Sequence, residues 1–133
     1  MRVMLDTNIF ISMIFFPGEQ TKLLALCLAA KHKIVVCDYV IEELRTVTER
    51  KFPAKKQALE QFFMELPFEY VHTPRKIEPD EFPEMRDLKD SPILATAIIE
   101  DVDVFLTGDK DFLVLDIPVP EILTMSEFLR KYG

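Results

Sequence analysis

The stretch that decides the fold is Arg2-Val3-Met4-Leu5-Asp6, a short apolar run that ends in a carboxylate. Such a run predicts a buried strand that stops at Asp6. The β-branched run at 33–37 predicts a second buried strand, and the runs at 68–72, 103–106 and 119–123 predict three more. Five strands, spread over the whole chain, are therefore expected.

Helical patterns separate these strands. Thr7 is a plausible N-cap for a helix over 8–15, although these residues also fit a strand, and Pro17-Gly18 ends the segment. Further helices are expected at 20–31, from the cap Asp38 to 51, at 54–66, at 91–101, as a short turn or helix at 110–115, and from the cap Ser126 to 132. Strands that alternate with helices predict a parallel sheet covered on both faces, so we expect a three-layer α/β/α domain.

The length and composition bound the class of protein. A chain of 133 residues with 49% hydrophobic and 29% charged residues predicts one globular domain over 1–133. No apolar run approaches the ~18 residues that cross a membrane, and the early Asp6 argues against a signal peptide. Cys27 and Cys37 lie in apolar surroundings, which predicts buried, reduced thiols in a cytoplasmic protein.

Scarce residue types argue against several kinds of site. The only two histidines, His32 and His72, are far apart in the chain, which disfavours a His-rich zinc site. Three glycines leave no Gly-rich phosphate loop and no dinucleotide fingerprint. The net charge of −7, from 23 acidic and 16 basic residues, disfavours nonspecific binding to nucleic acid unless several acids share a metal site.

Four acids are expected at one edge of the sheet, outside the carboxyl ends of the strands. Asp6 ends the first strand, Asp109 follows the fourth, and Glu43 lies about one turn into the helix after the second. Asp90 reaches the same edge because its helix begins there. Clustered carboxylates repel unless a cation is present, and hard divalent cations take oxygen ligands. The four acids therefore favour a site for metal-assisted phosphodiester hydrolysis.

Each acid also has an ordinary structural interpretation. Asp6 and Asp109 fit turn residues, Asp90 fits a helix cap, and Glu43 beside Glu42 fits a solvated helix surface. It is their joint placement at one edge that favours the functional interpretation.

Four short motifs resemble those of the PIN-domain ribonucleases, especially the toxin components of VapC-like toxin–antitoxin pairs. Leu5-Asp6-Thr7-Asn8-Ile9-Phe10 resembles the first motif, and Ile41-Glu42-Glu43-Leu44 resembles the second, in which the acid before Leu is the functional one. Asp87-Leu88-Lys89-Asp90, followed by Leu94-Ala95 and Ala97, resembles the third. Thr107-Gly108-Asp109-Lys110-Asp111-Phe112 resembles the fourth, and Met125-Ser126-Glu127-Phe128-Leu129 fits the family's usual ending. The resemblance spans essentially the whole chain.

The resemblance implies a PIN-like domain with its five strands in the order 3-2-1-4-5, and cleavage of RNA with one or two Mg²⁺ or Mn²⁺ ions. It assigns Asp6, Glu43, Asp90 and Asp109 to the catalytic metal site. Two further acids, Asp111 and Asp87, are implied as outer ligands or supporting acids. Asn8 and Thr107 are implied to orient carboxylates or water by hydrogen bonds, although a polar group in a helix turn and a turn hydroxyl are equally ordinary interpretations. A homodimer and, for a toxin, a cognate antitoxin are implied as partners, with no membrane.

Three features leave the partner surfaces open. The leucine-rich helix over 20–31 and the Phe62-Phe63 stripe fit either partner surfaces or plain core. The basic residues Arg45, Arg50, Lys51, Lys55 and Lys56 fit either a guide for an RNA backbone or a solvated helix face. The acidic segment 73–90 is expected to be a surface connection, longer than the family's pattern, and repels RNA unless it moves or metal ions offset its charge.

Other functions compete with a toxin ribonuclease. The same fold also serves RNA-processing nucleases that are not toxins, and non-catalytic modules that bind protein. Phosphoryl transfer through an aspartyl-phosphate on Asp6 requires a second carboxylate two residues on, where this chain has Asn8.

Overall fold

The first strand of the chain lies at the centre of the sheet. In the computed structural model, which describes residues 1–74 and 92–133, five parallel strands pair in the order β3-β2-β1-β4-β5. They are β1 (Arg2–Leu5), β2 (Lys33–Cys37), β3 (Phe68–Val71), β4 (Val104–Leu106) and β5 (Glu121–Leu123). Between β2 and β4, residues Val3 and Met4 of β1 lose all exposure to solvent. The expected fold class and strand order are confirmed.

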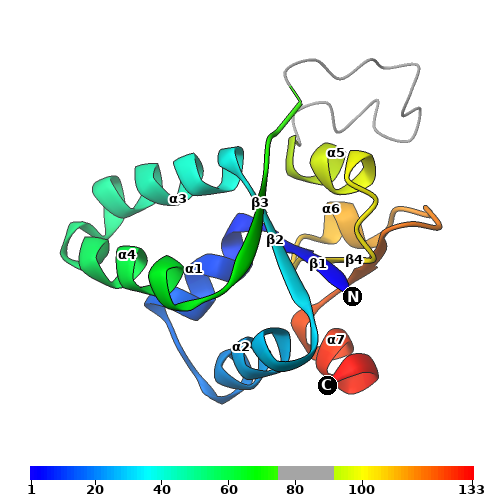
Figure 1. Cartoon of the computed structure of the whole chain (residues 1–133), viewed down its shortest axis with the longest axis horizontal. Helices are drawn as coiled ribbons and strands as arrows, with labels where there is room; N and C mark the ends of the chain where they lie inside the picture. Colours follow the sequence, from blue (N-terminus) through cyan, green and yellow to red (C-terminus); the bar gives the residue numbers. More distant parts are fainter. Residues whose placement is uncertain (75–91) are drawn as a thin grey trace.

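Helices cover the sheet on both sides. The described residues form α1 (Thr7–Phe15), α2 (Glu19–Lys31), α3 (Asp38–Lys51), α4 (Lys56–Glu65), α5 (Pro92–Ile99), α6 (Lys110–Leu113) and α7 (Met125–Tyr132), with a 3₁₀ turn at Pro53–Lys55. Figure 1 shows α1, α3 and α4 grouped on one side of the sheet, α5 and α6 on the other, and α2 next to α7. Because every crossover returns the chain to a parallel strand, all five carboxyl ends meet at one edge.

Three helix caps differ from those expected. Asp6, and not Thr7, caps α1, because its side chain already accepts a hydrogen bond from the Thr7 amide. Cys37 is the cap position of α3, and Asp38 is its first residue. Thr124, and not Ser126, caps α7, because Thr124 and Glu127 satisfy each other's backbone amides in a capping box.

The core accounts for one of the two apolar stretches that the sequence leaves open. Phe62 and Phe63 are partly buried, and both rings pack against the buried Phe10 of α1. For helix α2, which by sequence fits either a partner surface or plain core, the structure shows both environments. Leu24 and Leu28 are fully buried, whereas Leu23 and Leu26 are 59% and 68% exposed. One face of α2 therefore packs on the core and the other is apolar and open.

The remaining expectations concern single segments. Both cysteines are free thiols; Cys37 is buried and Cys27 is partly buried. Among the described helices, none is long and apolar enough by itself to cross a membrane, and α1 with α2 meets that test only as a pair bent by 113°, on length and composition alone. The connection expected at 73–90 lies outside the described residues beyond its first two positions.

Candidate functional site

Asp6 is the buried centre of the site. It follows β1 directly, its amide donates to the carbonyl of Leu106 on β4 at 2.9 Å, and it is only 8% exposed. Its two carboxylate oxygens have different donors. The Thr7 amide donates to Oδ1 at 2.8 Å, and the Thr107 hydroxyl donates to Oδ2 at 3.0 Å. The carboxylate is therefore held from two sides in one orientation.

Thr107 links Asp6 to the loop that carries Asp109. Thr107 is fully buried, and its amide donates to the carbonyl of Leu123 on β5 at 3.0 Å. Its hydroxyl oxygen accepts a hydrogen bond from the Asp109 amide at 3.0 Å while donating to Asp6. Asp109 in turn caps α6, because its Oδ1 accepts from the Asp111 amide at 2.9 Å. This chain of hydrogen bonds fixes the loop after β4 relative to the end of β1.

The electrostatics bring Glu43 into the same site. The pKa of Asp6 is raised, chiefly because burial removes water from the carboxylate; the Thr107 and Thr7 hydrogen bonds oppose this, and the charges of Glu43 and Asp109 raise it further. Glu43 and Asp109 therefore lie within electrostatic reach of Asp6. Glu43 is partly buried, whereas Glu42 beside it is exposed. Acids that follow three adjacent strands therefore interact electrostatically at this edge of the sheet.

The donor chemistry of this site fits a hard divalent cation. Asp6, Glu43 and Asp109 offer carboxylate oxygens, the ligands that Mg²⁺ and Mn²⁺ prefer. A buried anion with a raised pKa and like charges nearby is also one that a bound cation would stabilise. Within residues 1–74 and 92–133, however, no three His, Cys, Asp or Glu side chains gather closely enough to hold a metal ion. The described acids supply the chemistry of a metal site without completing its ligand set.

The other predicted site residues are exposed to solvent or fall outside the residues that the structure describes. Asp111 is exposed in the first turn of α6. Asn8 is exposed in the first turn of α1, and in the described part of the chain its side chain makes no hydrogen bond to an acid of the site. Asp87 and Asp90 fall within 75–91, outside the described residues. Their roles remain predictions.

The structure adds one group that the sequence did not indicate. The Thr7 hydroxyl, next to Asp6, is buried without a hydrogen-bond partner. The sequence offered no signal for this, since Thr7 was interpreted as a helix cap whose hydroxyl would bind a backbone amide. Only the shift of the cap to Asp6 leaves that hydroxyl unused.

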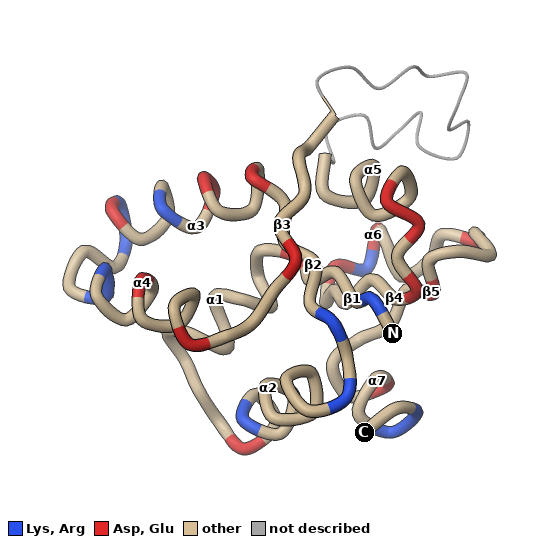
Figure 2. The backbone as a smooth tube through the Cα atoms, in the orientation of Figure 1, with Lys and Arg blue, Asp and Glu red and all other residues tan. Residues whose placement is uncertain are grey.

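Four of the five basic residues, Arg50, Lys51, Lys55 and Lys56, lie at the end of α3 or just before and at the start of α4, whereas Arg45 lies in the middle of α3. Figure 2 shows them around the connection between α3 and α4, with acidic positions interspersed along α3. Arg50 and Lys51 are exposed in the last turn of α3, about 12 Å along the helix axis from Glu43 at 1.5 Å per residue. Cations at a helix C-terminus also complement the helix dipole, so this cluster has a sufficient structural reason.

Comparison with known proteins gives the family. A family model described as PIN domain matches residues 2–111. Among solved structures, the crystal structure of VapBC2 from Rickettsia felis bound to a DNA fragment from their promoter matches with a TM-score of 0.73 and 22% identity, over 93% of this chain and 98% of that chain. At that identity the likeness concerns the fold. No curated protein matches the chain by sequence. The resemblance seen in the sequence is confirmed, and the chain belongs to the PIN domain family, whose members are generally nucleases.

Proposed function

We propose that this chain is a metal-dependent endoribonuclease and the toxin of a toxin–antitoxin pair. The observation that carries the proposal is the buried Asp6 at the centre of the sheet, with Glu43 and Asp109 within electrostatic reach. A buried carboxylate with like-charged neighbours is costly to a fold, so its presence in a PIN domain supports a functional role.

The residues divide the work as follows. Asp6, Glu43, Asp90 and Asp109 hold one or two Mg²⁺ or Mn²⁺ ions, with Asp87 and Asp111 as outer acids. When bound, the cation lowers the pKa of a water molecule and stabilises negative charge on the phosphodiester. Thr107 keeps Oδ2 of Asp6 oriented and positions Asp109 through the same hydroxyl. The hydrogen bond from the Asp6 amide to β4 fixes the backbone of this central ligand at the edge of the sheet.

The nuclease is tested on a mixed panel of RNAs with Mg²⁺, Mn²⁺ or EDTA. Wild type is compared with Asp6→Asn and Asp109→Asn, all purified identically, and Mn²⁺ binding is measured by calorimetry. Metal-dependent cleavage that both variants lose supports the proposal. Equal cleavage by all three indicates a contaminating ribonuclease, and a wild type that neither cleaves nor binds Mn²⁺ favours a non-catalytic binding module.

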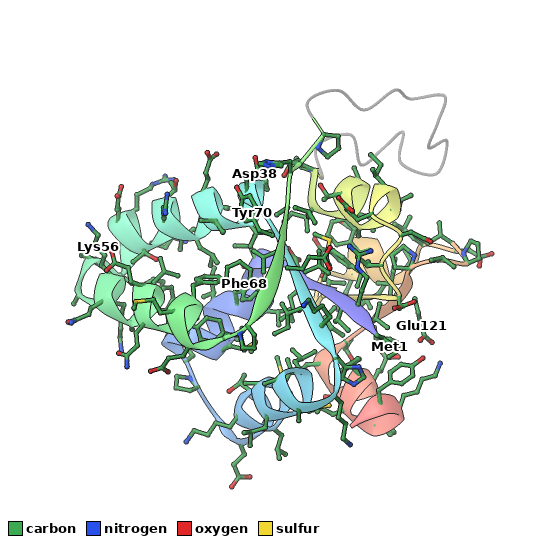
Figure 3. All side chains as sticks on the ribbon, viewed as in Figure 1. Met1, Asp38, Lys56, Phe68, Tyr70 and Glu121 are labelled. Carbon is green, nitrogen blue, oxygen red and sulfur yellow. The ribbon has the colours of Figure 1, made fainter. Side chains whose placement is uncertain are left out.

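An antitoxin partner is supported by a groove between α3 and α4. The groove has a volume of about 640 Å³ and runs beside the edge strand β3; Figure 3 shows Lys56 at the start of α4 and Phe68 at the start of β3, both among its lining residues. The apolar lining residues are Ile41, Leu59, Phe63, Met64 and Phe68. Arg45, Glu49, Lys56 and Glu60 add both signs of charge. An apolar floor with a polar rim suits an amphipathic protein segment better than an RNA backbone. The VapBC2 structure shows that this fold occurs in a two-component complex.

The toxin role is tested by growth. Induced wild-type protein should arrest cell growth, Asp6→Asn should not, and co-expression of the protein encoded beside this chain should rescue growth. Met64, which is 85% exposed, gives a probe of the groove because its replacement removes little packing. Met64→Glu should still arrest growth but escape rescue, whereas Leu26→Glu on the open face of α2 should remain rescued. Growth unaffected by active wild type would favour an RNA-processing nuclease that is not a toxin.

The homodimer is proposed on a different surface. The open face of α2 presents Leu23 and Leu26, and apolar side chains this exposed are typical of a covered surface when they adjoin one another. Light scattering of wild type and Leu26→Glu gives the test. A dimer that Leu26→Glu converts to monomer places the interface on α2, and a monomeric wild type contradicts the proposal.

A further inference from the structure

Thr7 is the exception among the buried threonines of the chain. Thr48, Thr96 and Thr107 are at most 1% exposed, and each hydroxyl donates a hydrogen bond, to Leu44 O at 2.6 Å, to Pro92 O at 2.7 Å and to Asp6 Oδ2 at 3.0 Å. Thr7 is 4% exposed and its hydroxyl has no partner. Among the described residues only His32 Nε2 shares this state, and it belongs to the residue after α2, on a ring that packs against α7.

The position of Thr7 in the fold explains why its hydroxyl is left over. Thr48 and Thr96 donate to the carbonyl four residues earlier in their own helices. Thr7 is the first residue of α1, so the carbonyl four residues earlier belongs to Val3 inside β1. Its amide is already used by Asp6 Oδ1. The helix start therefore provides no acceptor for the hydroxyl.

An unpartnered buried hydroxyl has a cost that valine would avoid. Leaving such a group unsatisfied costs about 1–3 kcal/mol, and valine has nearly the same shape without the polar atom. No hydrogen bond among the described residues uses this hydroxyl, and it lies on the residue next to the central acid. A partner that is present only in the loaded site would account for it.

We propose, on the basis of the proposed function, that Thr7 is a positioning residue whose hydroxyl hydrogen-bonds a water molecule in the hydration shell of the cation held at Asp6. Magnesium usually keeps several waters in protein sites, and each of their hydrogens needs an acceptor. A hydroxyl supplies an acceptor without adding negative charge to a site where Glu43 and Asp109 already repel Asp6. Threonine has two favoured χ1 positions in helices, so a side-chain rotation can turn the hydroxyl toward such a water.

The test compares Thr7→Val and Thr7→Ser with the control Thr48→Val, whose hydroxyl has a partner. Thermal unfolding without metal, Mn²⁺ affinity by calorimetry, and RNA cleavage are measured for each protein. Thr7→Val should unfold at or above the wild-type temperature but bind Mn²⁺ about 10–100-fold more weakly, the usual range for groups that support ligands, with a matching loss of cleavage. Thr7→Ser should restore both, and Thr48→Val should lower the unfolding temperature while keeping the affinity.

Two results would overturn the inference. If Thr7→Val binds Mn²⁺ and cleaves RNA like an active wild type, the hydroxyl has no role in metal binding or cleavage. If Thr7→Val unfolds at a lower temperature without metal and Thr7→Ser does not restore Mn²⁺ affinity, the residue is structural. A wild type that neither binds Mn²⁺ nor cleaves RNA instead removes the proposed function itself, and the inference with it.

Discussion

Two aspartates follow adjacent strands at the same edge of the sheet and have opposite environments. Asp6 follows β1 and Asp38 follows β2; Figure 3 shows Asp38 at the start of α3. Asp38 is partly exposed, and its Oδ1 accepts from both the amide and the hydroxyl of Thr73 at 2.6 Å. Its pKa is lowered, first by the Thr73 hydroxyl. Asp6 also accepts two hydrogen bonds, yet its pKa is raised.

The difference shows how an acid that serves the fold as a hydrogen-bond acceptor differs from the acid proposed to bind a cation. Hydrogen bonds lower the pKa of both carboxylates and burial raises it, but for Asp6 burial is the largest influence and like charges add to it, whereas for Asp38 the Thr73 hydroxyl is the largest. Asp38 keeps contact with water, and its hydrogen bonds from Thr73 link the end of β2 to the end of β3. Asp6 is shielded from water because it follows the central strand β1, and the charges of Glu43 and Asp109 act on it. Asp38 stabilises the fold, whereas the buried charge of Asp6 destabilises it. A bound cation would offset that destabilisation.

The comparison is tested most strongly by matched amide variants. Asp6→Asn should reduce metal-dependent RNA cleavage more than about 100-fold, the upper end of the effect of removing a supporting group, because it removes a ligand charge. Asp38→Asn should change cleavage by less than about threefold, because a neutral amide oxygen still accepts from Thr73. Initial cleavage rates at saturating Mn²⁺ give the measurement. Equal losses would mean that both acids belong to the site.

Removing the Thr107 hydroxyl, which links Asp6 to Asp109, should have the next largest effect on cleavage. Thr107→Val removes the donor to Asp6 and the acceptor for the Asp109 amide, so cleavage should fall about 10–100-fold. Thr107→Ser keeps the hydroxyl and should retain most of the activity. Cleavage kinetics over a Mn²⁺ series would show whether the loss lies in metal affinity or in turnover. Full activity of Thr107→Val would show that Asp6 is oriented without it.

Removing the Asp38 carboxylate should affect stability rather than activity. Asp38→Ala leaves the partly buried Thr73 amide and hydroxyl without their acceptor, which should lower the free energy of unfolding by about 1–2 kcal/mol. Asp6→Asn without metal should leave that free energy unchanged or raise it, because it removes a buried charge. Urea denaturation of both variants is the measurement. A large destabilisation by Asp6→Asn would contradict the view that ionised Asp6 opposes folding.

The smallest effects should appear in the pH dependence of stability without metal. The folded pKa of Asp6 lies above its unfolded value of about 3.9, so the folded state binds more protons and stability falls as pH rises through that window. The folded pKa of Asp38 lies below its unfolded value, so its contribution is lost as pH falls through the folded pKa. Asp6→Asn should flatten the first slope and Asp38→Asn the second in thermal unfolding at pH 2–7. Unchanged slopes in both variants would refute the assignment.

Much of the fold could be predicted because it depends on local pattern. The apolar runs of β1 and β2 and the alternation of strands with helices predict a parallel sheet, and the four motifs predict the family and the strand order. The placement of Asp6, Glu43 and Asp109 after three adjacent strands follows from the same reasoning. Each of these features is set by neighbours in the sequence or by the general rule that parallel strands end at one edge.

The tertiary structure alone decided the properties that depend on distant neighbours. Asp6 caps α1, has a raised pKa and accepts a hydrogen bond from the loop after β4. Asp38 accepts hydrogen bonds from Thr73, which follows the end of β3. Leu23 and Leu26 stayed exposed while Leu24 and Leu28 became core, since only the packing of α2 decides which face is covered. The sequence by itself determined which residues reach the edge of the sheet. Burial and the charges that meet there come from contacts between segments far apart in the chain, so only the folded structure decided which carboxylate has its pKa lowered and which has it raised.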